Sequence, residues 1–395
     1  MSQITEIIDD ATNPSTKPVF GPLVVSVIDK NGKLIYEHCS GFHIPTNPSK
    51  PVTTCSLFPI MSQTKIVTAV ATMILVERGT LNLDESVSKY LPEFENLTVI
   101  NADGTSHTPS KSSPTLRQLL THSAGLCYYF LHPGLVKWKK ENGGMMGLDG
   151  TIKPFEAPLI YQPGEGWMYG TGLEWISQVI QVVTCQSFGT FCKENIFTPL
   201  QMNDASFHPK KEISDWEERR VPFVNFSEEG LTEGNLPCSF DVAHEMGGYG
   251  LVCSPDDFTI FLATLIRGGV GPNDVRILKE QTIEEMFRPQ LDDPTFVQSK
   301  AESQFGKHMM PRMSQGETFK VNHGISGIIF TEDLKGRRRA GTMHWGGAPN
   351  TTWWVDRKSG IACHIMAQMG PQGTPLVSEL YESIERAIYS EFIKQ

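Results

Sequence analysis

Ser62 and Lys65 are the residues whose types and spacing most directly suggest chemistry. On a helix, side chains three residues apart lie on the same face, so the lysine amine can reach the serine hydroxyl. A serine hydroxyl is a weak nucleophile until an adjacent base removes its proton. The pair also opens a largely apolar stretch, where the positive end of a helix dipole favours a serine alkoxide. The spacing therefore predicts a serine nucleophile with a lysine as its general base.

A second copy of the same spacing shows that the pattern alone is weak evidence. Ser86 and Lys89 repeat it between a glycine turn at 79–82 and a Tyr-Leu-Pro sequence, which predicts a short surface segment. Taken alone, Ser62 fits a catalytic role and an ordinary helix N-terminus about equally well. Other motifs must decide between these two interpretations.

A loop centred on Tyr169 is the second candidate element. Residues 161–172 contain a Pro-Gly turn and several glycines, and a helix is predicted from Leu173. A tyrosine in such a loop can carry a proton between the serine and a leaving group. Trp167 and Gly170 flank it as candidate pocket residues. The same aromatic residues would equally suit a packed core.

The third candidate element is a glycine pair before a predicted strand, in the segment His344-Trp345-Gly346-Gly347-Ala348. Glycine permits close approach of the backbone to a ligand. A strand edge of this kind can direct a backbone N–H at a developing oxyanion. The first oxyanion donor would then be the N–H of the nucleophile and the second that of Gly347 or Ala348. A tight turn explains the same glycines.

The elements that must position these residues change along the chain. Strand, turn and strand are predicted for residues 23–36, and four further strands for 327–366. A final helix is predicted for about 376–392, and helices dominate the middle of the chain. These patterns predict an α+β fold in which both termini build one antiparallel sheet flanked by helices.

The same pattern predicts a single domain over residues 1–395 with two lobes. The sheet lobe would comprise about 20–65 and 300–395, and a mostly helical second lobe about 66–300. The chain is long enough for a large buried core.

Composition excludes several classes of function. The net charge of −10, from 44 acidic and 34 basic residues, argues against nucleic acid as a partner. The N-terminal segment lacks the basic start and apolar core of a signal peptide, and no stretch is apolar enough to span a membrane. We therefore expect no membrane partner and a cytoplasmic protein. The eight cysteines are scattered without a Cys-x-x-Cys pair, which predicts free thiols and no metal site.

No cofactor is expected either, because the sequence contains neither a phosphate-binding loop nor a dinucleotide fingerprint. A Gly-x-Ser-x-Gly nucleophile elbow is also absent, which argues against an α/β-hydrolase.

The order of the three motifs resembles the serine β-lactamase and penicillin-binding-protein superfamily, over about residues 20–393. That family orders Ser-x-x-Lys, a tyrosine motif, and a Lys-Thr-Gly or Trp-Gly-Gly strand. Residues 116–126 and 247–251 also resemble sequence segments of that family. Within it, residues 129–133, Tyr169-Gly170 and 346–350 resemble fungal acyltransferases that attach a methylbutyryl side chain during statin biosynthesis, and related esterases. The resemblance implies ping-pong acyl transfer through a seryl ester on Ser62.

Two departures from the β-lactamase pattern count against antibiotic hydrolysis. The Tyr-x-Asn motif becomes Tyr169-Gly170-Thr171, and the lysine of Lys-Thr-Gly is replaced by His344 or Trp345, depending on the alignment. The missing asparagine and lysine are groups with which that family holds a β-lactam. A cell-wall peptidase or β-lactamase is therefore disfavoured.

The resemblance also suggests substrates. It implies a small-molecule acyl donor, a thioester that is either small or bound to an acyl carrier protein of a polyketide synthase, and an alcohol acceptor. An aromatic insert is a candidate apolar lining of the cleft, with core packing as the equal alternative; its residues are Tyr128, Tyr129 and Phe130. Hydrolysis by the same machinery, or a non-acyl role for the cleft, are the alternative functions.

Overall fold

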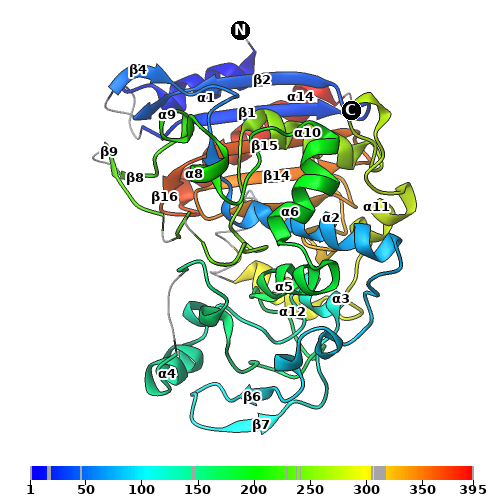
Figure 1. The fold of residues 1–395 in the computed structure, drawn as a ribbon. Helices are drawn as coiled ribbons and strands as arrows, with labels where there is room; N and C mark the ends of the chain where they lie inside the picture. Colours follow the sequence, from blue (N-terminus) through cyan, green and yellow to red (C-terminus); the bar gives the residue numbers. More distant parts are fainter. Residues whose placement is uncertain are drawn as a thin grey trace.

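A seven-stranded antiparallel sheet forms the centre of the structure, a computed structural model (Figure 1). The structure describes residues 2–15, 19–44, 47–144, 148–227, 230–236, 238–240, 242–303, 306 and 317–393. The strand order is β11-β12-β13-β14-β15-β1-β2. The bounds are β1 Leu23–Asp29, β2 Leu34–Ser40, β11 Val321–His323, β12 Ile328–Phe330, β13 Met343–Gly347, β14 Thr351–Asp356 and β15 Ile361–Ala367.

The pairing of β1 with β15 joins the two ends of the chain. Leu23 pairs with Ala367 and Asp29 with Ile361 along this ladder. The prediction of one sheet built from both termini is thereby confirmed, as is the α+β class.

Helices cover both faces of the sheet because strand side chains alternate between faces. Val25 packs in the cluster beneath α1 (Gln3–Thr12) and α14 (Pro375–Phe392). Its neighbour Val24 packs in the larger core, with α2 (Thr64–Glu77) and α10 (Pro255–Ile266). Helix α1, capped by the Ser2 side chain, was not predicted from the polar N-terminus.

Helix α10 packs on the sheet although it lies in the range expected for the helical lobe. It contacts β1, β14 and β15, and its Thr259 hydroxyl shares a 2.8 Å hydrogen bond with His364 of β15. Figure 1 shows α10 beside these strands, whereas α4 and the β6–β7 hairpin lie at the opposite end of the molecule. The middle of the chain thus contributes α10, which packs on the sheet, and also α4 and the β6–β7 hairpin, which lie away from it.

The remaining helices connect these layers. They are α3 Leu116–Leu120, α4 Pro133–Glu141, α5 Gly172–Thr184, α6 Phe188–Cys192, α7 Thr198–Leu200, α8 Pro209–Glu212, α9 Trp216–Arg219, α11 Glu280–Phe287 and α12 Thr295–Glu302. A π-helical segment, Lys193–Phe197, follows α6 directly. Short 3₁₀ turns are η1 Met61–Gln63, η2 Val87–Lys89, η3 Pro92–Phe94, η4 Tyr129–Leu131, η5 Lys153–Phe155 and η7 Pro272–Asp274.

Short strands complete the fold. They are β3 Phe42–Ile44 with β4 Asn47–Pro51, β5 Phe58–Pro59 with β10 Val252–Cys253, β6 Thr98–Ile100 with β7 His107–Pro109, and β8 Val224–Ser227 with β9 Gly230–Glu233 and β16 Met369–Gly370. Among the described residues, no helix combines the length and apolar character needed to cross a membrane.

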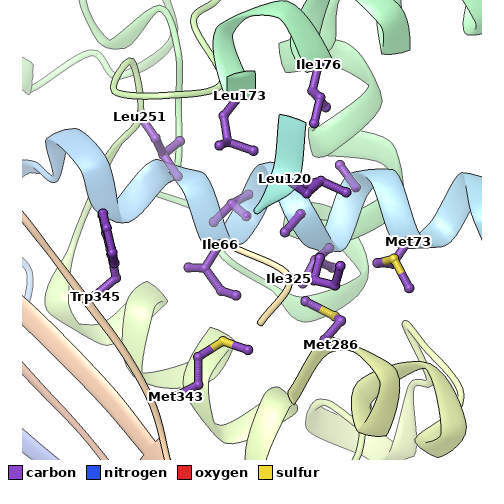
Figure 2. Packing of buried hydrophobic residues seen from close by; sticks show 14 of the residues in the cluster. Ile66, Met73, Leu120, Leu173, Ile176, Leu251, Met286, Ile325, Met343 and Trp345 are labelled. Carbon is purple, nitrogen blue, oxygen red and sulfur yellow. The ribbon is translucent and has the colours of Figure 1, made fainter. Parts of the chain in front are cut away.

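Helix α2 runs through the middle of the core. Residues 64–75 are all buried, as expected for a helix that is apolar on every side. Figure 2 shows Ile66 and Met73 of this helix among Leu120, Leu173 and Ile325. A side chain in its first turn is therefore anchored on a rigid element.

Candidate active site

The backbone before Ser62 turns sharply into α2. Strand β5 pairs with β10, the strained residue Met61 has a φ of 47°, and η1 then carries Ser62 to the start of the helix. A left-handed conformation is uncommon for a residue with a side chain, and such strain gathers at functional sites. The predicted helix start is thus a 3₁₀ turn, and Lys65 falls in the first turn of α2.

The structure brings Ser62, Lys65 and Tyr169 together. Ser62 Oγ shares a 2.6 Å hydrogen bond with the Tyr169 hydroxyl, and Lys65 Nζ donates to Ser62 Oγ at 3.4 Å. Lys65 Nζ also lies 4.9 Å from the centre of the Tyr169 ring. Lys65 is only 1% exposed. The candidate nucleophile, base and proton carrier therefore lie within direct reach of one another.

Lys65 is held by two further acceptors. Nζ donates to the carbonyl oxygen of Gly248 at 2.7 Å and to the Tyr128 hydroxyl at 3.0 Å. The Tyr128 hydroxyl in turn donates to the buried Glu174 carboxylate. These contacts aim the lysine amine at Ser62 from the side of the core.

Glu174 is a site residue that the sequence analysis missed. Burial raises the pKa of its carboxyl group, whereas the Lys65 charge and the Tyr128 hydroxyl act to lower it. Burial also raises the pKa of Tyr128 well above its ordinary value, so that the phenol stays protonated between its two partners. The signal available in the sequence was a single acidic residue in the otherwise apolar Leu173-Glu174-Trp175-Ile176 run.

Neighbouring side chains of the third motif, His344 and Trp345, point to opposite faces of the sheet. Trp345 faces the site, with its ring 5.2 Å from that of Tyr169, and Figure 2 shows it beside α2. His344 pairs with Trp354 and points to the opposite face, where Nδ1 lies 3.0 Å from the carbonyl oxygen of Trp353. Trp345, not His344, therefore lies beside Tyr169.

The end of β13 approaches the nucleophile through the glycine pair. A Cβ atom at Gly347 would come within 2.5 Å of the Ile60 carbonyl oxygen, so only glycine fits there. Ala348 follows as the first residue of the turn into β14. In the described part of the chain, no group accepts a hydrogen bond from the backbone amide of Ser62 or of Ala348. Both amides are available as oxyanion donors.

The candidate pocket residues take different places. Tyr128 belongs to the Lys65 network, and Trp167 is buried with its ring 5.7 Å from that of His323. Tyr129 packs in the adjacent cluster around α4. Phe130 is 56% exposed and stacks on Tyr128 at 5.4 Å. Of these four aromatic residues, Phe130 is the one that is mostly exposed to solvent.

Gly170 packs against another backbone segment. A Cβ atom there would overlap the carbonyl group of Leu126. We expect Gly170→Ala to destabilise the protein by about 1–3 kcal/mol through overpacking, and to lower kcat because the neighbouring Tyr169 must shift. Urea unfolding and ester hydrolysis check this. Gly21→Ala is the control, since its nearest neighbour, at 3.1 Å, is a side-chain atom of Val224. Equal effects of both substitutions would contradict the prediction.

Two buried histidines, His122 and His323, lie beside the site with their rings 5.4 Å apart. Burial lowers the pKa of His323 from 6.5 to about 4. Burial first, and then His323 and Lys65, hold the pKa of His122 well below its ordinary value. Both imidazoles are therefore neutral in the folded protein at neutral pH.

This difference predicts a loss of stability in acid. The unfolded chain protonates His323 near pH 6.5 and the folded protein only near pH 4. The stability that the neutral His323 contributes to the folded protein is fully present above pH 6.5. It declines by about 3 kcal/mol in total as the pH falls towards 4. We expect His323→Asn to lose less stability than the wild type between pH 7.5 and 4, measured by urea unfolding. Parallel pH curves for the two proteins would show the prediction to be wrong.

The comparisons with known proteins agree with this architecture. A helix-flanked antiparallel sheet, with a Ser-x-x-Lys pair at the head of a buried helix, defines a β-lactamase-type fold. The sequence model of the β-lactamase family matches residues 23–381, and the chain belongs to this family.

Its relatives are named as esterases and acyltransferases. The chain is 29% identical to a lovastatin esterase of Penicillium rubens, over 93% of this chain and 94% of the relative. It is 28% identical to the monacolin J acid methylbutanoyltransferase of Aspergillus terreus, over 93% and 91%. The unliganded simvastatin synthase of Aspergillus terreus superimposes with a TM-score of 0.84 at 26% identity, over 99% and 98% of the two chains. These relatives support an enzyme of the β-lactamase fold that acts on acyl groups.

Proposed function

We propose that this protein is a serine acyltransferase that moves an acyl group from a thioester to an alcohol of a secondary metabolite. The observation that carries the proposal is the contact of Ser62 Oγ with the Tyr169 hydroxyl at 2.6 Å, backed by Lys65 Nζ at 3.4 Å. The relatives named as methylbutanoyltransferases support transfer to an alcohol.

In the first half of the reaction, Ser62 Oγ attacks the thioester carbonyl. The serine proton passes to the Tyr169–Lys65 pair and then to the departing thiolate, and a seryl ester remains. The shorter contact favours Tyr169 as the group that takes the serine proton directly, while its own phenol proton passes to Lys65, whose amine is uncharged in the reactive form and acts as the base. The backbone amides of Ser62 and Ala348 would stabilise the oxyanion.

In the second half, the acceptor alcohol occupies the place that the thiol has left. Tyr169 takes the proton of the alcohol as its oxygen attacks the seryl ester, and the proton returns to Ser62 Oγ when the product ester leaves. The exposed Phe130 ring, stacked on Tyr128, supports an apolar acceptor or acyl chain at the mouth of the site.

Hydrolysis is the second candidate, and a specific comparison favours it. The relative from Penicillium rubens is named an esterase, and water can take the place of the alcohol in the same mechanism. The two functions differ only in which nucleophile reaches the seryl ester.

A partition experiment separates them. Small acyl thioesters, including 2-methylbutyryl, would be incubated with the enzyme, with and without a panel of polycyclic secondary alcohols, and the product ester and free acid quantified. The proposal predicts that an alcohol in the panel captures most of the acyl group. Steady release of free acid with no ester from any alcohol would favour the esterase.

A further inference from the structure

His122 bonds the backbone on both sides of Tyr169. The Met168 N–H donates to the His122 carbonyl oxygen at 3.1 Å, and the Gly170 N–H donates to the His122 ring nitrogen Nδ1 at 3.3 Å. The Tyr161 hydroxyl donates to the same carbonyl at 3.0 Å and fixes it. One residue thus sets the position of the loop that carries the candidate proton carrier.

The His122 side chain also joins the tyrosine loop to the strand of the third motif. Its ring meets that of Tyr169 edge to face at 5.0 Å and lies nearly parallel to that of Trp345, 26° apart at 6.0 Å. The sequence analysis assigned this histidine no role, although its segment matched the family pattern.

The backbone at His122 is strained. His122 has a φ of 58°, in the left-handed region that residues with a side chain adopt at a cost, and it is only 4% exposed. A helix ending such as that of α3 could use glycine there without strain. The chain thus carries an imidazole at a position where glycine would be less strained.

The hydrogen bond fixes the protonation state that the ring needs. Nδ1 accepts from Gly170 and so carries no proton, which places the single ring proton on Nε2. Burial and the nearby Lys65 charge keep the ring neutral, in agreement with its lowered pKa.

We propose that His122 is a positioning residue for acyl transfer: by bonding the backbone before and after Tyr169 and stacking on Trp345, it holds the Tyr169 hydroxyl against Ser62 and in register with the oxyanion strand. The inference rests on the proposed function, since it concerns the geometry of the same site. His122 would then contribute to acyl transfer without touching the substrate or the reacting atoms.

Two substitutions at His122 separate positioning from packing. In His122→Asn, the side-chain oxygen can take the place of Nδ1 as acceptor for the Gly170 N–H, whereas His122→Leu fills similar space without an acceptor. We expect kcat for p-nitrophenyl ester hydrolysis to fall about 100-fold in the leucine variant with KM unchanged within about twofold, because a misplaced catalytic group affects the chemical step. The asparagine variant should regain about tenfold or more of the lost kcat.

His323→Leu is the matched control. This neighbouring histidine contacts the His122, Trp167 and Trp345 rings, but its Nδ1 bonds the Gly324 carbonyl oxygen and, among the described residues, no group of the tyrosine loop. Its loss removes comparable aromatic packing, including the contact with Trp167, but no hydrogen bond to the tyrosine loop, so kcat should stay within about threefold. A 100-fold loss here as well would assign the His122 effect to packing and overturn the proposal.

Crystal structures of the two His122 variants provide a readout that does not depend on activity. The distance from Ser62 Oγ to the Tyr169 hydroxyl should exceed 3.5 Å in the leucine variant and stay near 2.6 Å in the asparagine variant. An unchanged distance in His122→Leu, or equal kcat values in the two variants, would overturn the proposal. An inactive wild-type enzyme would contradict the proposed function, and the crystallographic comparison would still decide the role of His122.

Discussion

Ser62→Ala is expected to reduce both acyl transfer and ester hydrolysis by about 10⁵-fold or more. The substitution removes the only atom that can form the seryl ester, while the oxyanion amides and the pocket stay in place. Losses of this size are typical of nucleophile removal in serine enzymes. The measurement is kcat/KM with a p-nitrophenyl ester, on protein whose unfolding midpoint shows that it is folded.

The second Ser-x-x-Lys sequence offers a matched control. Ser86 shares a hydrogen bond with Ser88 rather than with Lys89, and Lys89 pairs with Glu85 at 2.6 Å on the surface. Ser86→Ala should therefore keep full activity. If Ser62→Ala retained more than about 1% of the wild-type rate, a serine nucleophile at this position would be excluded.

Glu385→Ala is expected to cost about 3–5 kcal/mol of stability, the largest structural effect that we predict. Glu385 on α14 accepts hydrogen bonds from Arg337 at 2.8 Å and Arg338 at 3.0 Å, and all three side chains are buried. Burial alone would raise the pKa of Glu385, but the two guanidinium groups lower it to about 2. Removing the carboxylate takes away the counter-ion that the two buried guanidinium groups share. Urea unfolding at pH 7 measures the loss.

An exposed ion pair gives the comparison for this prediction. Glu280 pairs with Arg357 at 3.1 Å, and its side chain is 60% exposed. Glu280→Ala should cost less than about 1 kcal/mol, because water screens such pairs. A loss below 1 kcal/mol for Glu385→Ala as well would show that the buried cluster relaxes or takes up water.

The sequence predicted the sheet because its signals are local. Short runs rich in β-branched and aromatic residues, such as 23–28 and 351–355, indicate strands, and the turn residues between successive runs indicate antiparallel neighbours. Short-range spacing likewise indicated Ser62 with Lys65, and the structure adds their contacts. The end of α6 could not be predicted in this way, since the π-helical segment that follows depends on local packing.

Tertiary contacts account for what the sequence did not reveal. The choice between His344 and Trp345 depended on strand register, because a shift of one residue exchanges the two faces of a sheet. Glu174 is connected to Lys65 through the Tyr128 hydroxyl, and these residues are far apart in the chain. His122 likewise meets the tyrosine loop through a fold-dependent contact of residues 48 positions apart.

The most direct test of the account is intact-protein mass spectrometry of the acyl-enzyme. The wild type and Ser62→Ala would each be mixed with small acyl thioesters, quenched in acid within milliseconds to seconds, and weighed, with peptide mapping of any adduct. The account predicts a single added acyl group on the wild type, located on the peptide that contains Ser62, and none on the variant. An adduct of equal yield on Ser62→Ala, or donor turnover by the wild type with no adduct at any quench time, would contradict it.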